Sequence, residues 1–285
     1  MLSIAGAQAG VSTVGAQLIR DGVNIVYRLP NRVVARIGPA GSYATAAHLI
    51  RVSRWLATTD VPAVRALDDI EQPTLVADRP VTWWIQLPDH RPATAAELGA
   101  ALKQVHALTA PESPPLPLLD PFSGVDAAIA HATTITERDR AWLDRLLAGL
   151  RSEYAVLQDT LPRCVIHGDA WQGNLAVPRD GAPTLVDLDH FGIGPREWDL
   201  APFTVDYTDF SRITAAEYGE FVAAYGGYDM TTQPYYRTLA TTMELRWIAF
   251  ALRKANSDPH AALEARHRLA CLRGDIEPPW RWTAF

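Results

Sequence analysis

The first third of the chain alternates short apolar runs with turn residues. Between residues 11 and 37, β-rich runs are separated by Asp21-Gly22 and Pro30-Asn31, which predicts an antiparallel meander. Apolar runs of similar length continue to residue 87 and predict the remaining strands of a small sheet. The predicted strands end at Ile19 or cover Asn24–Leu29, Val33–Ile37, Val64–Leu67, Thr74–Ala77 and Val81–Leu87.

Apolar residues at helical spacing dominate the rest of the chain. The clearest start signal is Thr94 followed by Glu97, a capping box in front of an Ala- and Leu-rich stretch. The pattern predicts an α+β protein with a small antiparallel-sheet region at residues 1–87 and a larger, mainly helical region at residues 88–285. The predicted helices cover Ser42–Thr58, Thr94–Leu108, Val125–Thr133, Glu137–Leu157, Ala215–Tyr225, Gln233–Ala255 and Pro259–Leu272.

One stretch, residues 163–200, places polar residues directly after short apolar runs. Asp169 and Asp187 each follow such a run, at the ends of strands, where functional side chains gather. Asn174 lies between them, ahead of a third run and a turn at residues 178–181 that reverses the chain. The sequence therefore predicts that these three side chains converge.

The three side chains suit the transfer of a phosphoryl group. Mg²⁺ prefers oxygen ligands, so an Asn amide oxygen and an Asp carboxylate can hold it together with substrate phosphates. A kinase uses, in chain order, an Asp that accepts the substrate hydroxyl proton, an Asn for the metal and a second metal-binding Asp on a later strand. Asp169, Asn174 and Asp187 follow that order.

The stretch resembles the H-G-D-x-x-x-x-N loop and the later I-D-x-x-x-x-G of aminoglycoside phosphotransferases and choline kinases, and Asp199-Leu200-Ala201 resembles a further motif of that family. The resemblance implies a two-lobed, protein-kinase-like fold with ATP as co-substrate. It implies that Asp169 is the catalytic base and that Asn174 and Asp187 bind Mg²⁺. It also implies that His167 and Asp199 brace the loop.

The resemblance assigns the nucleotide to residues 1–87. The turn that holds Gly22 and Asn24 lies where a kinase-like fold places its phosphate-covering loop, and both residue types tolerate the tight backbone that lets amides approach a phosphate. Gln86 and Leu87 resemble the hinge between lobes. There, backbone groups would hydrogen-bond an adenine in an apolar slot.

Two positions depart from the family pattern. The cation on the third strand is usually Lys, whereas this chain has Arg36, which keeps the charge but changes the geometry offered to a phosphate. The predicted helix at residues 42–58 has no acidic residue to pair with that cation, and His48 is the nearest polar substitute by register. We therefore expect an atypical nucleotide clamp at Arg36 and His48.

The family seats its acceptor between the catalytic loop and the last helices. Several acidic residues in this region could bind an amine, so we expect a cationic acceptor. It would be an aminoglycoside-like, amino-sugar or choline-like compound. Antibiotic resistance is one role such a protein could have, but fold likeness does not transmit substrate identity. The candidate anchors are Asp189, Asp206, Asp209 and Glu244.

Charge and composition argue against several other classes. The 285 residues carry a net charge of −6, with +2 over residues 1–87 and −8 over the remainder, which argues against nucleic acid as the main partner. The two cysteines, Cys164 and Cys271, have neither zinc spacing nor a disulfide framework. No apolar run approaches the ~20 residues that span a bilayer, so we expect no membrane partner and a cytoplasmic location.

Two alternatives account for part of the pattern. The absent Lys and helix Glu also suit a non-catalytic, pseudokinase-like nucleotide-binding protein, although the catalytic and metal-binding residues are present. A metal-dependent hydrolase would instead use His167, Asp169, Asp187, Asp189 and His190 as a metal cluster, but it lacks a second H-x-H or H-x-x-E-H pair. The kinase hypothesis accounts for the largest number of these features.

Overall fold

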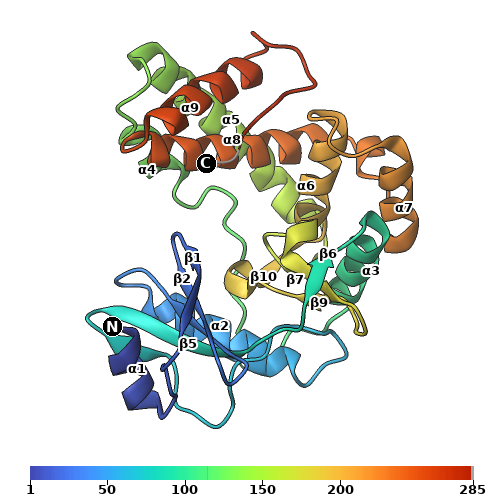
Figure 1. The fold of residues 1–285 in the computed structure, drawn as a ribbon. Helices are drawn as coiled ribbons and strands as arrows, with labels where there is room; N and C mark the ends of the chain where they lie inside the picture. Colours follow the sequence, from blue (N-terminus) through green and yellow to red (C-terminus); the bar gives the residue numbers. More distant parts are fainter. Residues whose placement is uncertain (114, 284–285) are drawn as a thin grey trace.

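The computed structural model describes residues 1–113 and 115–283. A β-sheet lobe formed by the N-terminal part of the chain faces a group of helices formed by the C-terminal part (Figure 1). Two small sheets and helices α3 and α7 lie between these ends. The α+β class predicted from the sequence is confirmed.

The N-terminal lobe contains a five-stranded sheet, ordered β1-β2-β3-β5-β4, in which every neighbouring pair is antiparallel. The predicted meander is confirmed as its first three strands. The predicted strand at Val64–Leu67 is wrong, because that segment forms only an isolated bridge, between Ala66 and Trp84. The strands are β1 (Gln17–Asp21), β2 (Ile25–Leu29), β3 (Val33–Ile37), β4 (Thr74–Val76) and β5 (Arg79–Ile85).

Each face of this sheet packs on a core, whereas the edge strand β1 is exposed. One face, with Ala35 and Trp83, packs in a small core that includes Ala5 of α1 (Leu2–Ala9). Trp84 on the other face joins α2 (Tyr43–Leu56) in the large core that continues into the C-terminal lobe. Helix α1 was not predicted, because its Ala- and Gly-rich residues have no clear amphipathic period.

The predicted helices of the C-terminal lobe are confirmed, and the Thr94–Glu97 capping box is present. Helix α6 was not predicted, because Pro202 inside it and glycines just before it are strong breaker signals. Gly99 allows α3 to approach α7 closely, since a Cβ there would meet the Phe221 carbonyl oxygen at 2.5 Å. The helices are α3 (Ala95–His106), α4 (Val125–Ala130), α5 (Glu137–Thr160), α6 (Glu197–Thr208), α7 (Ala215–Tyr225), α8 (Tyr236–Ala255) and α9 (Pro259–Leu272).

Two small antiparallel sheets carry the central stretch, and the three apolar runs predicted there are confirmed as β7, β8 and β9. No helix in residues 1–113 or 115–283 is long and apolar enough to cross a bilayer. The strands are β6 (His90–Pro92), β7 (Arg163–Ile166), β8 (Leu175–Pro178), β9 (Thr184–Leu185) and β10 (Gly192–Pro195), and the short helices are η1 (Gln172–Asn174), η2 (Leu188–His190) and η3 (Met230–Thr232).

Candidate active site

Helix α6 holds the loop that follows β7. The carboxylate of Asp199 accepts hydrogen bonds from the backbone N–H groups of His167 (2.7 Å) and Gly168 (2.8 Å). The same carboxylate lies 3.1 Å from His106 Nε2, and the Asp199 side chain is completely buried. Trp198 Nε1 donates to the Gly168 carbonyl oxygen at 3.1 Å. The backbone that leads into Asp169 is therefore fixed by neighbouring residues of one helix.

The same loop packs directly on η2. Gly168 has a φ of +83°, and a Cβ at this position would lie 2.2 Å from the His190 carbonyl oxygen. His167 Nε2 lies 3.0 Å from the Val186 carbonyl oxygen and donates to it. Only glycine can adopt this positive φ and still leave room for the His190 carbonyl group. The loop therefore packs tightly against the segment that carries Asp187.

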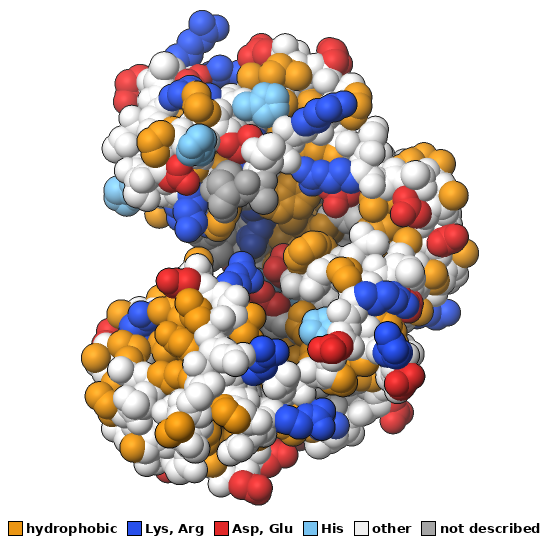
Figure 2. All heavy atoms as spheres, viewed as in Figure 1, with side chains coloured by type: hydrophobic (Ala, Val, Ile, Leu, Met, Phe, Trp, Pro, Cys, Tyr) orange, Lys and Arg blue, Asp and Glu red, His pale blue; other side chains and the backbone are white. Residues whose placement is uncertain are grey.

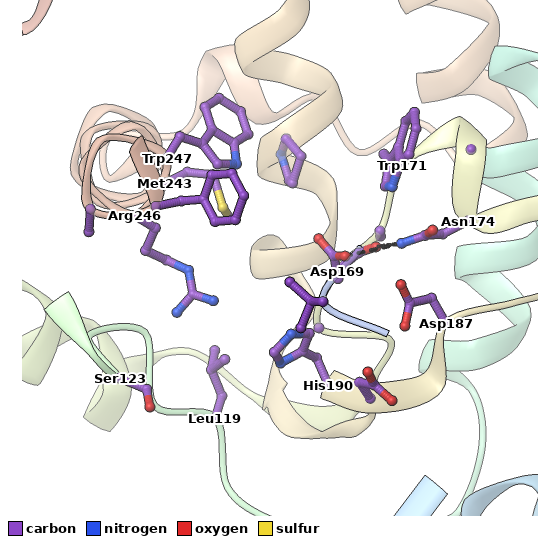
Figure 3. Close-up of a pocket in the computed structure, with 18 of the residues that line it drawn as sticks. Leu119, Ser123, Asp169, Trp171, Asn174, Asp187, His190, Met243, Arg246 and Trp247 are labelled. Atoms are coloured by element: carbon purple, nitrogen blue, oxygen red, sulfur yellow. Dashed lines mark hydrogen bonds between the residues drawn. The ribbon is translucent and has the colours of Figure 1, made fainter. Parts of the chain in front are cut away.

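Asp169, Asn174 and Asp187 line one cleft (Figure 3). Asn174 Nδ2 donates to Asp169 Oδ2 at 3.1 Å and to the Asp169 carbonyl oxygen at 2.8 Å. The Val186 N–H donates to the Asn174 carbonyl oxygen at 3.0 Å, which sets the next residue, Asp187, beside β8. The structure thus brings together the three residues on which the sequence argument depends.

The charges around Asp187 favour a cation. Desolvation raises the pKa of Asp187, and the neighbouring carboxylates of Asp189 and Asp169 raise it further, against the opposing effect of Arg36. Asn174 uses its Nδ2 to bind Asp169, which leaves its amide oxygen for another partner. The amide oxygen of Asn174 and the carboxylate of Asp187, which lies near other carboxylates, are suitable ligands for Mg²⁺. Phosphate oxygens and water would complete its coordination shell.

A cavity of about 910 Å³ lies under the sheet, next to Asp187, and the hinge residues line it. The Gln86 N–H donates to the Arg32 carbonyl oxygen at 2.8 Å, so in the described chain the Leu87 N–H is the hinge amide left for a base. The slot has apolar walls from both lobes, as an adenine site requires. Those walls are formed by Leu18, Val26, Val34, Leu49, Val64, Trp84 and Leu188.

Arg36 pairs with Asp189, not with His48. Its Nη1 donates to Asp189 Oδ1 at 2.9 Å, and its Nη2 contacts the second carboxylate oxygen. His48 Nε2 instead bonds the Phe191 carbonyl oxygen at 3.1 Å, and burial lowers the pKa of its ring. The expected substitution of His48 for the helix acid is therefore corrected, because the acid comes from the segment after Asp187.

Of the two residues expected to cover the phosphates in the turn between β1 and β2, only Asn24 lines a cavity. Asn24 lines a second, larger cavity that contains Asp169, whereas Gly22 lines neither cavity. Gly22 has no positive φ, and a Cβ there would meet nothing closer than 3.5 Å. Arg20, which comes just before the same turn, lines both cavities but was not among the predicted site residues.

The larger cavity, of about 1330 Å³, extends from the catalytic loop to α6, α8 and the C-terminal tail. Asp189 and Asp206 line it, whereas Asp209 and Glu244 do not, and Glu244 is completely buried. All four predicted amine anchors already bind an arginine. The pairs are Asp189 with Arg36, Asp206 with Arg212, and both Asp209 and Glu244 with Arg237.

Helix α8 supplies a wall of this cavity that sequence analysis missed. Its residues at positions 243, 246, 247, 250 and 253 all line the cavity. Their three-, four- and seven-residue spacing puts them on one face of the helix and was the available signal. The side chains are Met243, Arg246, Trp247, Phe250 and Arg253, and the exposed Trp171 of the catalytic loop lines the same space.

Residues 16–241 match the model of the phosphotransferase enzyme family, APH, and the chain belongs to this family. The resemblance stated from the loop motif is thereby confirmed. No curated protein matches the chain in sequence.

Solved structures share the whole fold. A choline/ethanolamine kinase family protein from Mesorhizobium loti is 19% identical, with a TM-score of 0.67, 98% of this chain covered and 95% of the other. The aminoglycoside phosphotransferase APH(3'')-Id from Streptomyces rimosus, in complex with ADP and streptomycin, is 21% identical, with a TM-score of 0.63 and coverages of 84% and 95%. The amicoumacin kinase hAmiN, in complex with AMP-PNP, Ca²⁺ and Ami, is 12% identical, with a TM-score of 0.72 and coverages of 99% and 95%. These likenesses confirm the two-lobed, protein-kinase-like fold.

Proposed function

We propose that this protein is a small-molecule kinase that transfers the γ-phosphoryl group of ATP to a hydroxyl group of its acceptor. The observation that carries the proposal is the position of Asp187, which lines both cavities, with Asp169 and Asn174 beside it. Residues 1–87 would hold the nucleotide in the smaller cavity. Residues 88–285 would hold the catalytic loop and the acceptor in the larger one.

In the proposed reaction the acceptor hydroxyl oxygen attacks the γ-phosphorus, and the bond to the oxygen that bridges the β- and γ-phosphorus atoms breaks. ADP leaves, and the hydroxyl proton passes to the exposed carboxylate of Asp169. Asn174 orients that carboxylate through its hydrogen bond. Mg²⁺ held by Asn174 and Asp187 would supply positive charge to the phosphates. Arg20 and Arg36 are the basic side chains that line both cavities, so they are suited to binding phosphates there.

The family match supports this proposal, and so do the nucleotide and small-molecule ligands in the S. rimosus and amicoumacin kinase complexes. The intact loop supports catalysis over the pseudokinase-like alternative. In the described chain no three His, Cys, Asp or Glu side chains form a metal cluster, so the hydrolase alternative has less support. The expected cationic acceptor also has less support, because its four candidate anchors already bind arginines.

A screen for ADP release tests the proposal. Purified protein is incubated with ATP and alcohols that carry an amine, no charge or a carboxylate, with Mg²⁺ and separately with excess EDTA. We expect ADP release that requires both Mg²⁺ and an acceptor. Failure to bind ATP analogues, or ADP release that no alcohol stimulates, would contradict the proposal.

A further inference from the structure

We propose that the acceptor carries an anionic group, such as a carboxylate, which Arg246 and Arg253 of α8 bind. This inference rests on the proposed function, since it names the acceptor class of the same cleft. It also replaces the cationic acceptor expected from the sequence with one of opposite charge.

The two arginines are placed on the acceptor side of the cleft. They lie seven residues apart, about two helical turns, and therefore share a face of α8. Both line the larger cavity. Figure 3 shows Arg246 extending from α8 into this cavity, across from Asp169. Basic and acidic side chains are both visible inside the hollow between the lobes (Figure 2).

The acids nearest to Arg246 act on it from a distance, since Asp169 and Asp120 raise the pKa of its guanidinium electrostatically. In residues 1–113 and 115–283 Arg246 and Arg253 form no ion pair, whereas Arg36 and Arg212 in the same cleft each do. Arg246 donates to the Pro121 carbonyl oxygen at 3.0 Å and lies over the Trp198 ring at 5.3 Å. A guanidinium has five N–H donors, so this contact leaves most of those of Arg246 available.

In the described chain the lack of a paired carboxylate matters most at Arg246, which is half-buried, whereas Arg253 is exposed. Burial lowers the pKa of both Arg246 and Arg253, yet an arginine stays protonated at neutral pH. A partly desolvated cation is stabilised by an anion that forms charge-assisted hydrogen bonds with it. Asp120 acts on Arg246 only from a distance, because its carboxylate accepts the Phe122 N–H and forms no ion pair with Arg246 in the described chain.

The rest of the cavity defines the body of the acceptor. Trp171, Met243 and Trp247 add apolar surface between the catalytic loop and α8. Aromatic and thioether side chains bind rings and hydrocarbon segments. The acceptor that fits is therefore a hydroxy acid with an apolar body. Its hydroxyl group lies at Asp169, and its anionic group lies against α8.

Matched sets of small alcohols test this inference. One set is meta-hydroxymethylbenzoate with its amide and with the corresponding benzylamine. The other is gamma-hydroxybutyrate with its amide and with the corresponding amino alcohol. Dissociation constants are measured by calorimetry for the nucleotide-free protein and for protein loaded with AMP-PNP and Mg²⁺. We expect the carboxylate of at least one set to bind at least about tenfold more tightly than the amide and the amine of the same set.

Variants locate the preference. Arg246→Gln and Arg253→Gln should each weaken carboxylate binding by about ten- to a hundredfold and leave amide binding unchanged. Lys254→Gln removes an exposed charge from the same end of α8, outside the cavity, and should change neither. AMP-PNP binding by each variant shows that its fold is retained.

Three outcomes would overturn the inference: no carboxylate binds, an amide or amine binds as tightly as the carboxylate, or the preference survives when Arg246→Gln and Arg253→Gln are combined. Failure of AMP-PNP binding or of ADP release counts instead against the proposed function. The two failures are distinguishable, because the carboxylate preference is also measured in the nucleotide-free protein.

Discussion

Arg36 and Asp189 join β3 to η2 through a two-point ion pair, although 153 residues separate them in the sequence. Their side chains are only 18% and 20% exposed, so solvent and salt screen this pair less than a surface pair. The pair also holds a guanidinium nitrogen 4.0 Å from a carboxylate oxygen of Asp187. The ion pair that the family builds from Lys and a helix acid therefore has its counterpart here in Arg36 and in an acid two residues after Asp187.

Substitution of each partner separates phosphate binding from bracing of the lobes. If Arg36 contacts the nucleotide phosphates, Arg36→Met should weaken Mg·AMP-PNP binding by about ten- to a hundredfold, the value of a charge-assisted contact. Asp189→Asn leaves the guanidinium in place and should retain binding. Calorimetric titration of both variants measures this difference, and equal losses in the two would show that the pair acts only as a brace.

Asp187→Asn should stabilise the metal-free protein at neutral pH. The folded-state pKa of Asp187 is raised, so its ionised form costs stability, and the cost appears as the pH rises through the ordinary Asp range and persists above the raised pKa. Thermal melting without Mg²⁺ should therefore give a higher Tm for the variant at neutral pH, with the difference shrinking toward about pH 4. The variant should also lose the stabilisation that Mg·AMP-PNP gives the wild type. A lower Tm at neutral pH would contradict this account.

Asp199→Ala should destabilise the protein strongly. It removes the acceptor for the buried N–H groups of His167 and Gly168, and each unsatisfied donor costs about 1–3 kcal/mol. The control is Asp126→Ala, which removes an exposed carboxylate that pairs with Arg151 and should change the free energy of unfolding little. Urea unfolding compares the two variants, and similar losses in both would argue against a brace at Asp199.

The parts of the site that the sequence predicted are local. Asp169, Asn174 and Asp187 lie within eighteen positions of one another, and strand ends and a turn set their order. The capping box at Thr94 was equally local, because its donors and acceptors lie three residues apart. The close packing of Gly168 on His190, in contrast, depends on tertiary structure that no spacing reveals.

The parts that could not be predicted depend on partners far apart in the chain. From the sequence alone, any carboxylate in this region is a candidate for binding an amine. In the structure, however, Asp209 and Glu244 already pair with Arg237. The opposite error concerns Arg246 and Arg253. Their helical period indicates a shared face, but only packing shows that this face lines a cavity and that no acid pairs with them in the described chain. Charge counted along the sequence therefore favoured a cationic acceptor, opposite in sign to the one that we propose.

Transfer of a labelled γ-phosphoryl group tests the central claim most directly. The label is followed from ATP to the best acceptor of the screen, at saturating Mg·ATP, with the wild type and with Asp169→Asn. The account predicts that the wild type transfers the label and that the variant does so about 10²–10⁴-fold more slowly, with Mg·AMP-PNP affinity retained, because only the proton acceptor is lost. Label transfer by Asp169→Asn at the wild-type rate, or no transfer by the wild type to any acceptor, would contradict it.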